Sequence, residues 1–407
     1  MAATKLLFIT GAFPPMCVGE ADHAFQLCHR LAERGLDVHV LTTRGGTETA
    51  HTTFTVHPIM RDWSWSDLPR FITFLKRCSP DVIMLMYIGF IYNEHPMVTF
   101  APAISKTVLH AALFVTQFEN IYGANPQSTT FLARVLRKGI MLWLGRKRTN
   151  YYFGTLLHDS DRIITLSNHH LAELCKLAPD LEKKSVVIPV PPLMGVNSGN
   201  EGTLRERGRN LLKVKSEDFV ITYFGRIYPD KGIDTLLRAF QLVATHRCNV
   251  RLVLVGGHIY SGRYQHFRSF ADEIVQLPTG LGIADKVTWT GEYAWDSELP
   301  LMYLRASDLC VLPYRFGVQL NNSSFSAAAS QGLPIITTQG ETIDEPFRHK
   351  ENVYLCQPED PNVLASAIET LLDGPDLRER LAYGALKLAQ ERFSWESVID
   401  RTIKTFS

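Results

Sequence analysis

The chain has 407 residues, of which 45% are hydrophobic and 20% are charged, with a formal net charge of +1. This length and composition predict about two ordinary globular domains, and the near-zero charge argues against a general nucleic-acid binder. The seven cysteines form no CxxC pair, and the start of the chain lacks a basic stretch followed by an apolar core. Both features favour a reduced, cytoplasmic protein.

The first half opens with the pattern strand, loop, helix, strand. Residues 5–10 and 38–42 are predicted as strands, and 21–34 as an amphipathic helix between them. The connecting loop carries Gly19 close to the helix start. Most glycines in such loops only satisfy turn geometry, so Gly19 alone is weak evidence for a ligand site. The longest apolar run, 82–92, is about half of a membrane span. This run is therefore expected to hold a buried strand and not a membrane span. Strands are predicted near 82–87, 107–115 and 162–166.

Residues 134–150 contain six basic residues, no acidic residue and an apolar run that includes Trp143. A basic, apolar, Trp-bearing helix is typical of contact with an anionic membrane surface. A core-packed helix with a solvated basic end explains the same pattern and is the commoner case, so both interpretations stay open. Asp159 and Asp161 follow, but no third ligand lies nearby in sequence. We expect them to cap the next element rather than to bind a metal.

Prolines and glycines recur through 189–216, which predicts a linker and a domain boundary. Beyond it, strand and helix patterns alternate, as expected of a parallel α/β domain. Strands are predicted near 219–224, 251–255, 287–290, 309–312, 334–337 and 353–356. Helices are predicted near 234–246, 264–277, 298–306, 323–331, 361–372 and 376–392.

The segment 219–256 is a complete strand–loop–helix–strand unit, and its loop carries Arg226 and Lys231. Ligands of such units bind at the carboxyl ends of the strands. A cationic loop before a helix start favours an anion, because the first helical N–H groups are unpaired and carry partial positive charge. A solvated loop with ordinary surface charges remains the alternative.

Several segments, taken in order, resemble the retaining family-four glycosyltransferases of the GT-B fold. They are PPMCVGEADHAFQLCHRLAERGLDVHVLT, SDRIITLS, FGRIYPDKGIDTLLRAF, VRLVLVGG, KVTWTGEY, ASDLCVLPY, QGLPIITT and FSWESV. The resemblance runs from Lys5 to the last helix. It implies an α/β protein of two facing Rossmann-like domains, with a C-terminal helix that crosses back to the first. The expected limits are 1–195 for the acceptor-binding domain, 196–385 for the nucleotide-sugar-binding domain and 386–407 for the returning helix.

The resemblance also implies roles for individual residues. Arg226 and Lys231 match the positions that hold the donor diphosphate, and Gly19 matches the glycine whose backbone approaches the same phosphates. The nucleotide-sugar is then a substrate, and neither a cofactor nor a metal is expected, because fixed cations and N–H groups stabilise the departing diphosphate. The donor sugar and ribose are expected at Phe316, Gly317, Val318, Gln319, Asn321, Asn322 and Ser323.

The sequence departs from the family pattern in this donor region. Two glutamates are usual there, but their positions fall here at 314–315 and at Ala327, and none of these residues is Glu. Asn321 and Asn322 replace two arginines of a similar subgroup with a longer Gly-Val-x loop. Amide or hydroxyl groups of Asn or Ser are expected to take over the ribose contact, and backbone N–H groups of 316–319 to contact the sugar and phosphate.

A second departure lies in the first domain. Phe118 occupies the place of the usual sugar-facing histidine, and Glu119 follows as the acid. The candidates for a catalytic role are therefore Glu119, His23 and Asp22, although Asp22 also suits the first turn of a helix. The sequence assigns no nucleophile.

The leading hypothesis is a retaining transferase that moves a hexose from a nucleotide-sugar, with UDP-glucose as the default, to a sugar, small-molecule or lipid-linked acceptor. The alternative is a degenerate relative that binds a nucleotide-sugar or a partner without turnover. A sugar-nucleotide epimerase on the same fold is a weaker third hypothesis. The expected location is the cytoplasm, with peripheral contact at the inner membrane face if 134–150 binds lipid.

Overall fold

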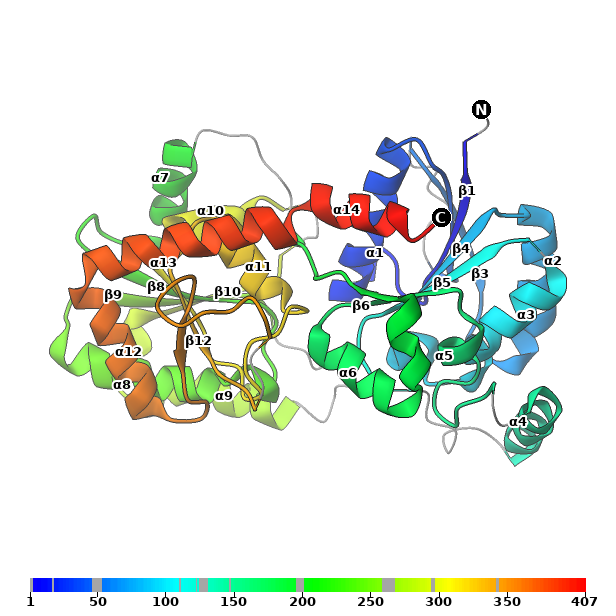
Figure 1. Ribbon diagram of the computed structural model, residues 1–407. Coiled ribbons are helices and arrows are strands. Elements are labelled where there is room, and N and C mark those ends of the chain that lie inside the picture. Colours follow the sequence, from blue (N-terminus) through cyan, green and yellow to red (C-terminus); the bar gives the residue numbers. More distant parts are fainter. Residues whose placement is uncertain are drawn as a thin grey trace. The chain divides into compact units, whose positions relative to one another are not determined.

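The computed structural model describes residues 3–16, 18–45, 53–109, 111–121, 123, 131–145, 148–194, 201–257, 268–293, 297–341 and 344–407. The chain divides into two compact units (Figure 1). The first combines Met1–Pro189 with Glu396–Ser407, and the second is Val190–Trp395. The boundary thus lies before the expected limit of 195. The returning segment begins later than 386, because Phe393 still packs against Phe325 of the second unit.

The first unit is built on a seven-stranded parallel sheet with the order β3-β2-β1-β4-β5-β6-β7. The central strand β4 is buried along its whole length, as expected of a parallel sheet covered on both faces. The strands are β1 (Lys5–Ile9), β2 (Asp37–Thr43), β3 (Thr55–Met60), β4 (Val82–Tyr87), β5 (Leu113–Phe118), β6 (Arg162–Thr165) and β7 (Ser185–Val187).

The C-terminal helix α14 (Trp395–Lys404) belongs to the first unit from Glu396 onwards. Asp400 accepts a hydrogen bond of 2.6 Å from Arg34, and Arg401 donates to the carbonyl oxygen of Val187. These contacts tie the end of the chain to this unit. Its other helices are α1 (Gly19–Glu33), α2 (Leu68–Cys78), α3 (Ala101–Val108), α4 (Phe131–Leu144), α5 (Leu156–Asp159) and α6 (Asn168–Leu177).

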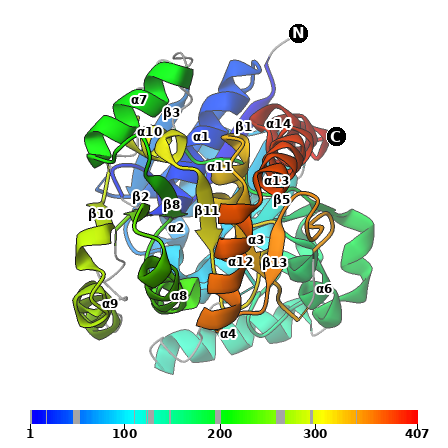
Figure 2. The same ribbon diagram turned by 90° about the vertical axis from the view of Figure 1, so that its left-hand side faces the viewer.

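The second unit has a six-stranded parallel sheet with the order β10-β9-β8-β11-β12-β13 (Figure 2). Its strands are β8 (Phe219–Phe224), β9 (Val250–Val255), β10 (Val287–Gly291), β11 (Leu309–Leu312), β12 (Ile335–Thr338) and β13 (Tyr354–Cys356). Its helices are α7 (Glu201–Leu212), α8 (Ile233–His246), α9 (Arg268–Gly280), α10 (Leu299–Ala306), α11 (Ser323–Ser330), α12 (Pro361–Asp373) and α13 (Pro375–Leu388).

Both sheets reverse their strand order beside the first strand, between β1 and β4 and between β8 and β11. Ligands of such sheets bind outside the carboxyl ends of the strands at this switch point. The loop that carries Arg226 and Lys231 follows β8 directly, so the switch point of the second sheet lies where the sequence predicted an anion site.

Two predicted elements are wrong. The strand expected at 107–115 is instead the end of α3 and the start of β5, because its apolar residues fit either period. The linker expected at 189–216 contains α7, which packs against α10. A Cβ at Gly208 would lie 2.2 Å from the carbonyl oxygen of Met302, so this glycine permits a close helix contact.

Candidate functional site

The candidate donor site begins where β8 ends. A Cβ at Gly225 would lie 2.4 Å from the Oγ atom of Ser324, so the first turn of α11 packs directly against the loop that carries Arg226. The first N–H groups of a helix lack partners within the helix and carry partial positive charge. The arrangement therefore brings a helix start and a guanidinium to the same sheet edge.

Arg226 is partly exposed, and its Nη1 atom lies 3.7 Å from Oε1 of Glu292, which follows β10. The side chains of Arg226 and Glu292 expose 31% and 62% of their surfaces. Such exposed ion pairs contribute about 0–1 kcal/mol. A phosphate group can therefore replace Glu292 at low cost, and Arg226 remains suited to an anion.

Lys231 is held by aromatic rings. Its Nζ atom lies 4.7 Å from the ring centroid of Tyr314 and 5.1 Å from that of Tyr228. Burial holds the pKa of the Tyr314 phenol well above its usual range, so this ring stays neutral. The ammonium group is attracted to the ring faces, which fix its position without neutralising its charge.

Arg315 occupies one of the positions at which the family pattern has a glutamate. Its Nη2 atom donates to Oδ2 of Asp234 at 2.9 Å, and its backbone N–H donates to the carbonyl oxygen of Asp230 at 3.0 Å. Arg315 therefore ties the loop after β11 to the start of α8. Sequence reasoning missed this role, although Tyr314 and Arg315 directly follow a buried strand of a parallel sheet.

The loop before α11 uses most of its own N–H groups. Those of Gly317, Val318 and Gln319 donate to the carbonyl oxygen of Tyr314, the carbonyl oxygen of Thr338 and Oδ1 of Asn322. These three N–H groups have partners within the turn, and their contact with a sugar or phosphate stays a prediction. Phe316 is 70% exposed, whereas Ala327 is buried in α11. Asn322 shapes the loop, and Asn321 and Ser323 stay candidates for donor contacts.

In the first unit the structure brings together two residues that the sequence considered separately. His23 on α1 and Glu119 after β5 lie 3.2 Å apart, with 3% and 8% of their side chains exposed. Gln117 also donates to Glu119, at 2.6 Å. Burial raises the pKa of Glu119, but the charge and hydrogen bonds of His23 and the hydrogen bond of Gln117 outweigh it, so the pKa lies below its usual value. Glu119 is thus held as a carboxylate.

The remaining first-unit candidates have local explanations. Phe118 is fully buried and packs edge-on against Tyr87 and Phe153, so the residue in the usual histidine position belongs to the core. Asp22 lies in the first turn of α1. Gly19 is the first residue of α1 rather than part of the loop before it, and a Cβ there would meet no atom within 4 Å. The space beside Gly19 is open to a ligand.

Two family models match consecutive parts of the chain. Residues 19–191 match the model described as "Glycosyltransferase Family 4", and residues 218–374 match the one described as "Glycosyl transferases group 1". The chain belongs to the family-four glycosyltransferases. Each model covers one of the two units, and the candidate donor loop lies inside the second.

Named relatives agree with this family. The D-inositol 3-phosphate glycosyltransferase of Thermomonospora curvata is 28% identical over 260 residues, which span 61% of this chain and 57% of the relative. The enzyme of the same name from Rhodococcus opacus is 29% identical over 251 residues, spanning 61% of this chain and 53% of the relative. The chain therefore matches a little over half the length of these relatives.

Solved structures show the fold. Sucrose-phosphate synthase from Thermosynechococcus elongatus has a TM-score of 0.70 at 18% identity, with 99% of this chain and 98% of the other covered. HepE of Anabaena, solved with UDP and glucose, has a TM-score of 0.70 at 17% identity, with 99% of each chain covered. The chain has the GT-B fold, with two Rossmann-like α/β domains.

The acidic pair after the basic segment is used inside the first unit. Arg148 donates twice to Asp159, at 3.1 and 2.9 Å, while Asp161 bonds Lys106 at 2.6 Å and accepts the N–H of Phe114 at 2.9 Å. The expectation that these aspartates cap the next element is wrong, because strong donors from other segments take them. Within the described ranges, no group of three or more His, Cys, Asp and Glu could hold a metal ion.

Helix α4 carries part of the basic segment 134–150. Val135 and Leu142 are 49% and 75% exposed, whereas Arg137 is buried. The structure does not describe the side chain of Trp143. The part of the predicted membrane contact that rests on this residue is therefore not tested. No described helix is both long and apolar enough to cross a bilayer.

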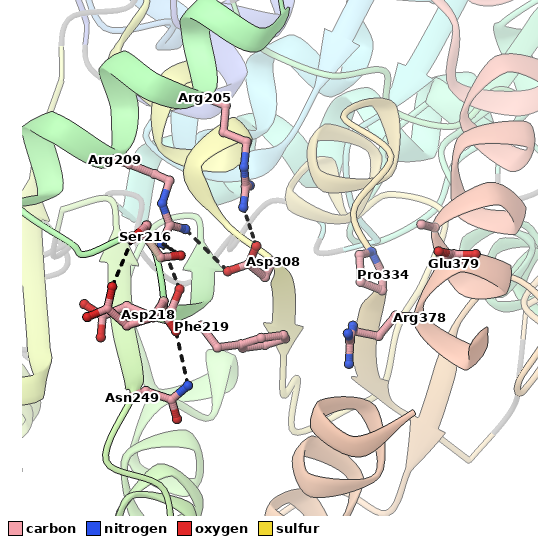
Figure 3. Close-up of a pocket in the computed structure, with 12 residues that line it drawn as sticks. Arg205, Arg209, Ser216, Asp218, Phe219, Asn249, Asp308, Pro334, Arg378 and Glu379 are labelled. Carbon is pink, nitrogen blue, oxygen red and sulfur yellow. Dashed lines mark hydrogen bonds and ion pairs between the residues drawn. The ribbon is translucent and has the colours of Figure 1, made fainter. Parts of the chain in front are cut away.

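The second unit contains a cavity of about 400 Å³, and Figure 3 shows the residues that line it. It lies at the opposite end of the second sheet from Arg226, which follows β8. It is lined by Phe219, where β8 begins, and by Asp308, which precedes β11. Two of its arginines are already used: Arg205 bonds Asp308 at 2.5 Å, and Arg209 donates to the carbonyl oxygen of Asp218 at 2.8 Å. The cavity therefore lies among structural ion pairs, away from the candidate donor site.

Proposed function

We propose that this protein transfers a hexose from a nucleotide-sugar to an acceptor, with retention of the anomeric configuration and without a metal ion. The single observation that carries the proposal is the pair Arg226 and Lys231, which follows β8 at the switch point of the second sheet. UDP-glucose is the default donor, and HepE, a fold neighbour, has been solved with UDP-glucose. No cofactor is needed, because the nucleotide-sugar is itself the substrate.

The chemistry requires cations at this place. Negative charge develops on the nucleoside diphosphate as the sugar–phosphate bond breaks. Groups that are already fixed stabilise this charge without reorganising during the reaction. Lys231 is fixed by two tyrosine rings, and Arg226 offers a planar set of donors to phosphate oxygens. Ser323, at the start of α11, and Asn321 are the side chains that we assign to the donor sugar or ribose, while Gly19 is assigned to the phosphates.

The first unit is assigned to the acceptor. The buried His23–Glu119 pair lies at the carboxyl end of β5, where ligands of parallel sheets bind. We assign these two residues a positioning role and name no nucleophile. The acceptor class stays open among a sugar, a small molecule and a lipid-linked compound. A lipid-linked acceptor would suit a cytoplasmic protein that contacts the inner membrane face through 134–150.

A degenerate protein that binds a nucleotide-sugar without turnover is the second candidate. It is favoured by the absence of glutamate at 314–315 and at Ala327, and by the burial of Phe118. It is disfavoured by Arg226 and Lys231, because a protein released from catalysis has no reason to keep both cations.

The test is release of UDP from UDP-glucose, with and without candidate acceptors, by wild type and three folded variants. Since the cations act mainly as charge develops, Arg226→Ala and Lys231→Ala should each lower turnover by on the order of 10²–10³ and weaken donor binding less. Glu273→Ala, at an exposed site on α9, is the matched control and should keep wild-type turnover. Near-normal turnover in both cation variants would refute the donor site. Donor binding without turnover by wild type would favour the degenerate protein.

A further inference from the structure

Arg137, on α4, is a buried arginine with no counterion among the residues that the structure describes. Only 3% of its surface is exposed. In the part of the chain that the structure describes, its Nε, Nη1 and Nη2 atoms have no hydrogen-bond partner. A buried charge normally requires both a partner and hydrogen bonds, because leaving water is otherwise costly. This guanidinium therefore lacks what other buried charges have.

The residues close to Arg137 in the sequence cannot supply the missing partner. Residues 120–158 contain neither aspartate nor glutamate. Asp159, the next acid, is engaged at both oxygens by Arg148. No carboxylate is among the groups that act on the pKa of Arg137, which is lowered by burial and raised by the phenols of Tyr151 and Tyr87. The described residues therefore offer Arg137 no counterion.

The stacking of Arg137 leaves its donors available. Its Cζ atom lies 4.7 Å from the ring centroid of Tyr151, which covers one face of the guanidinium. The five N–H groups lie in the guanidinium plane, so a ring on the face leaves them able to bind a planar or tetrahedral oxyanion. A stacked guanidinium is also held in one orientation, which favours two parallel hydrogen bonds to one anion.

The location of Arg137 suits a ligand. Tyr87, which acts on its pKa, is the last residue of β4, beside the switch point of the first sheet. The basic charge of Arg137 also reaches His95, whose pKa is lowered first by burial, with Arg137 adding to the effect and Asp62 opposing it. Arg134 and Lys138 are exposed on the same helix. Arg137 thus shares its helix with two further cations, and no carboxylate acts on it among the described residues. This charge favours a phosphate as the ligand over a singly charged carboxylate.

We propose that Arg137 binds a phosphate group of the acceptor, so that the acceptor is a phosphorylated molecule. That the bound phosphate belongs to an acceptor rests on the proposed function. That Arg137 binds an anion does not. The phosphate can belong to a soluble sugar phosphate or to a lipid headgroup, and both present the same oxygens to the guanidinium.

The first measurement uses inorganic phosphate as the probe. Thermal unfolding of the full chain is followed in phosphate and in chloride at equal ionic strength, with saturating UDP to occupy the donor site. Wild type should gain about 2–4 °C in phosphate, as expected when an anion binds the folded state at several times its dissociation constant. Arg137→Met should lose this gain. In chloride it should melt no lower than wild type, because an unpaired buried charge has been removed.

Two control variants make the result specific. Arg134→Met removes an exposed charge from the same helix and should keep the phosphate response, whereas loss of the response there would mean a diffuse charge effect and overturn the site. Arg137→Lys keeps a charge without the planar donors and should lose most of the response, which decides the matter if Arg137→Met does not fold. An equal response in wild type and both Arg137 variants, or no response in wild type, would overturn the proposal.

The last arms separate this proposal from the donor assignment and identify the source of the phosphate. Arg226→Ala should keep the phosphate response but lose stabilisation by UDP. The phosphate response therefore tests the Arg137 site, and stabilisation by UDP tests the donor site separately. Glucose 6-phosphate and vesicles that contain phosphatidic acid are then compared. A response that depends on Arg137 in one of them identifies a soluble or a lipid phosphate, and no such response in either would overturn a phosphorylated acceptor.

Discussion

Two histidines, His23 and His170, act on Glu119. His23 is paired with the carboxylate at 3.2 Å. His170, on α6, is buried, and burial together with the charge of His169 lowers its pKa to about 4, although Glu119 opposes this shift. An ordinary histidine has a pKa near 6.5, so between about pH 4 and pH 6.5 His170 stays neutral in the folded protein while the unfolded chain takes up a proton.

His170 therefore makes stability depend on pH. Its folded pKa is below its unfolded value, so the stabilisation is fully present above about pH 6.5 and is lost as the pH falls towards 4. The full loss is roughly 3–4 kcal/mol, because the pKa differs by about 2.5 between the folded and unfolded states and each pH unit corresponds to about 1.4 kcal/mol. Urea unfolding at pH 7 and pH 4 should show a smaller pH effect in His170→Gln than in wild type. His246→Gln, exposed on α8, should match wild type, and equal pH effects in all three proteins would contradict the prediction.

At the scale of elements, α4 combines two uses of basic residues. Arg137 is buried, whereas Arg134, Lys138 and the apolar Leu142 are exposed. The described side chains thus support neither a fully core-packed helix nor a wholly solvated one. A helix with exposed cations beside exposed apolar side chains is suited to an anionic membrane surface.

We expect α4 to bind anionic vesicles weakly, with roughly 1 kcal/mol for each cation that reaches the lipid surface. Co-sedimentation with anionic and neutral vesicles measures this. The double variant Arg134→Glu, Lys138→Glu should lose anionic binding. The pair Lys176→Glu, Lys183→Glu, exposed elsewhere in the first unit, is the matched control and should retain it. Equal binding of wild type to both vesicle types would remove the membrane contact.

At the scale of the whole molecule, each unit brings its own sheet and its own set of polar groups to the carboxyl ends of its strands. The second unit carries Arg226 and Lys231, and the first carries the His23–Glu119 pair. Under the proposed function, the positive charge that stabilises the departing diphosphate comes from residues of the second unit.

We therefore predict that transfer survives a chelator. Arg226, Lys231 and the start of α11 are proposed to supply the positive charge that a metal would supply elsewhere. UDP release from UDP-glucose is measured with and without EDTA and after dialysis. Turnover that falls in EDTA and returns with manganese or magnesium would contradict this assignment. Asp159 and Asp161 would then be reconsidered as metal ligands.

The sequence by itself determined the features that depend on local patterns. Strands β4, β8 and β11 lie where their apolar runs predicted them, because a buried parallel strand is marked by its own composition. The loop with Arg226 and Lys231 was located in the same way, since it directly follows such a strand. By contrast, the apolar stretch at 107–115 was assigned to a strand wrongly, because periodicity did not separate a helix end from a strand start.

Only the tertiary structure decided contacts between distant segments. His23 meets Glu119 because α1 and β5 are placed by the order of the sheet, which no local pattern encodes. The same holds for Glu292 beside Arg226 and for the tyrosine rings around Lys231. In the sequence, Arg137 is one of six basic residues in 134–150. Its burial is visible only in the folded protein, because burial is set by what packs around a side chain and not by its own type.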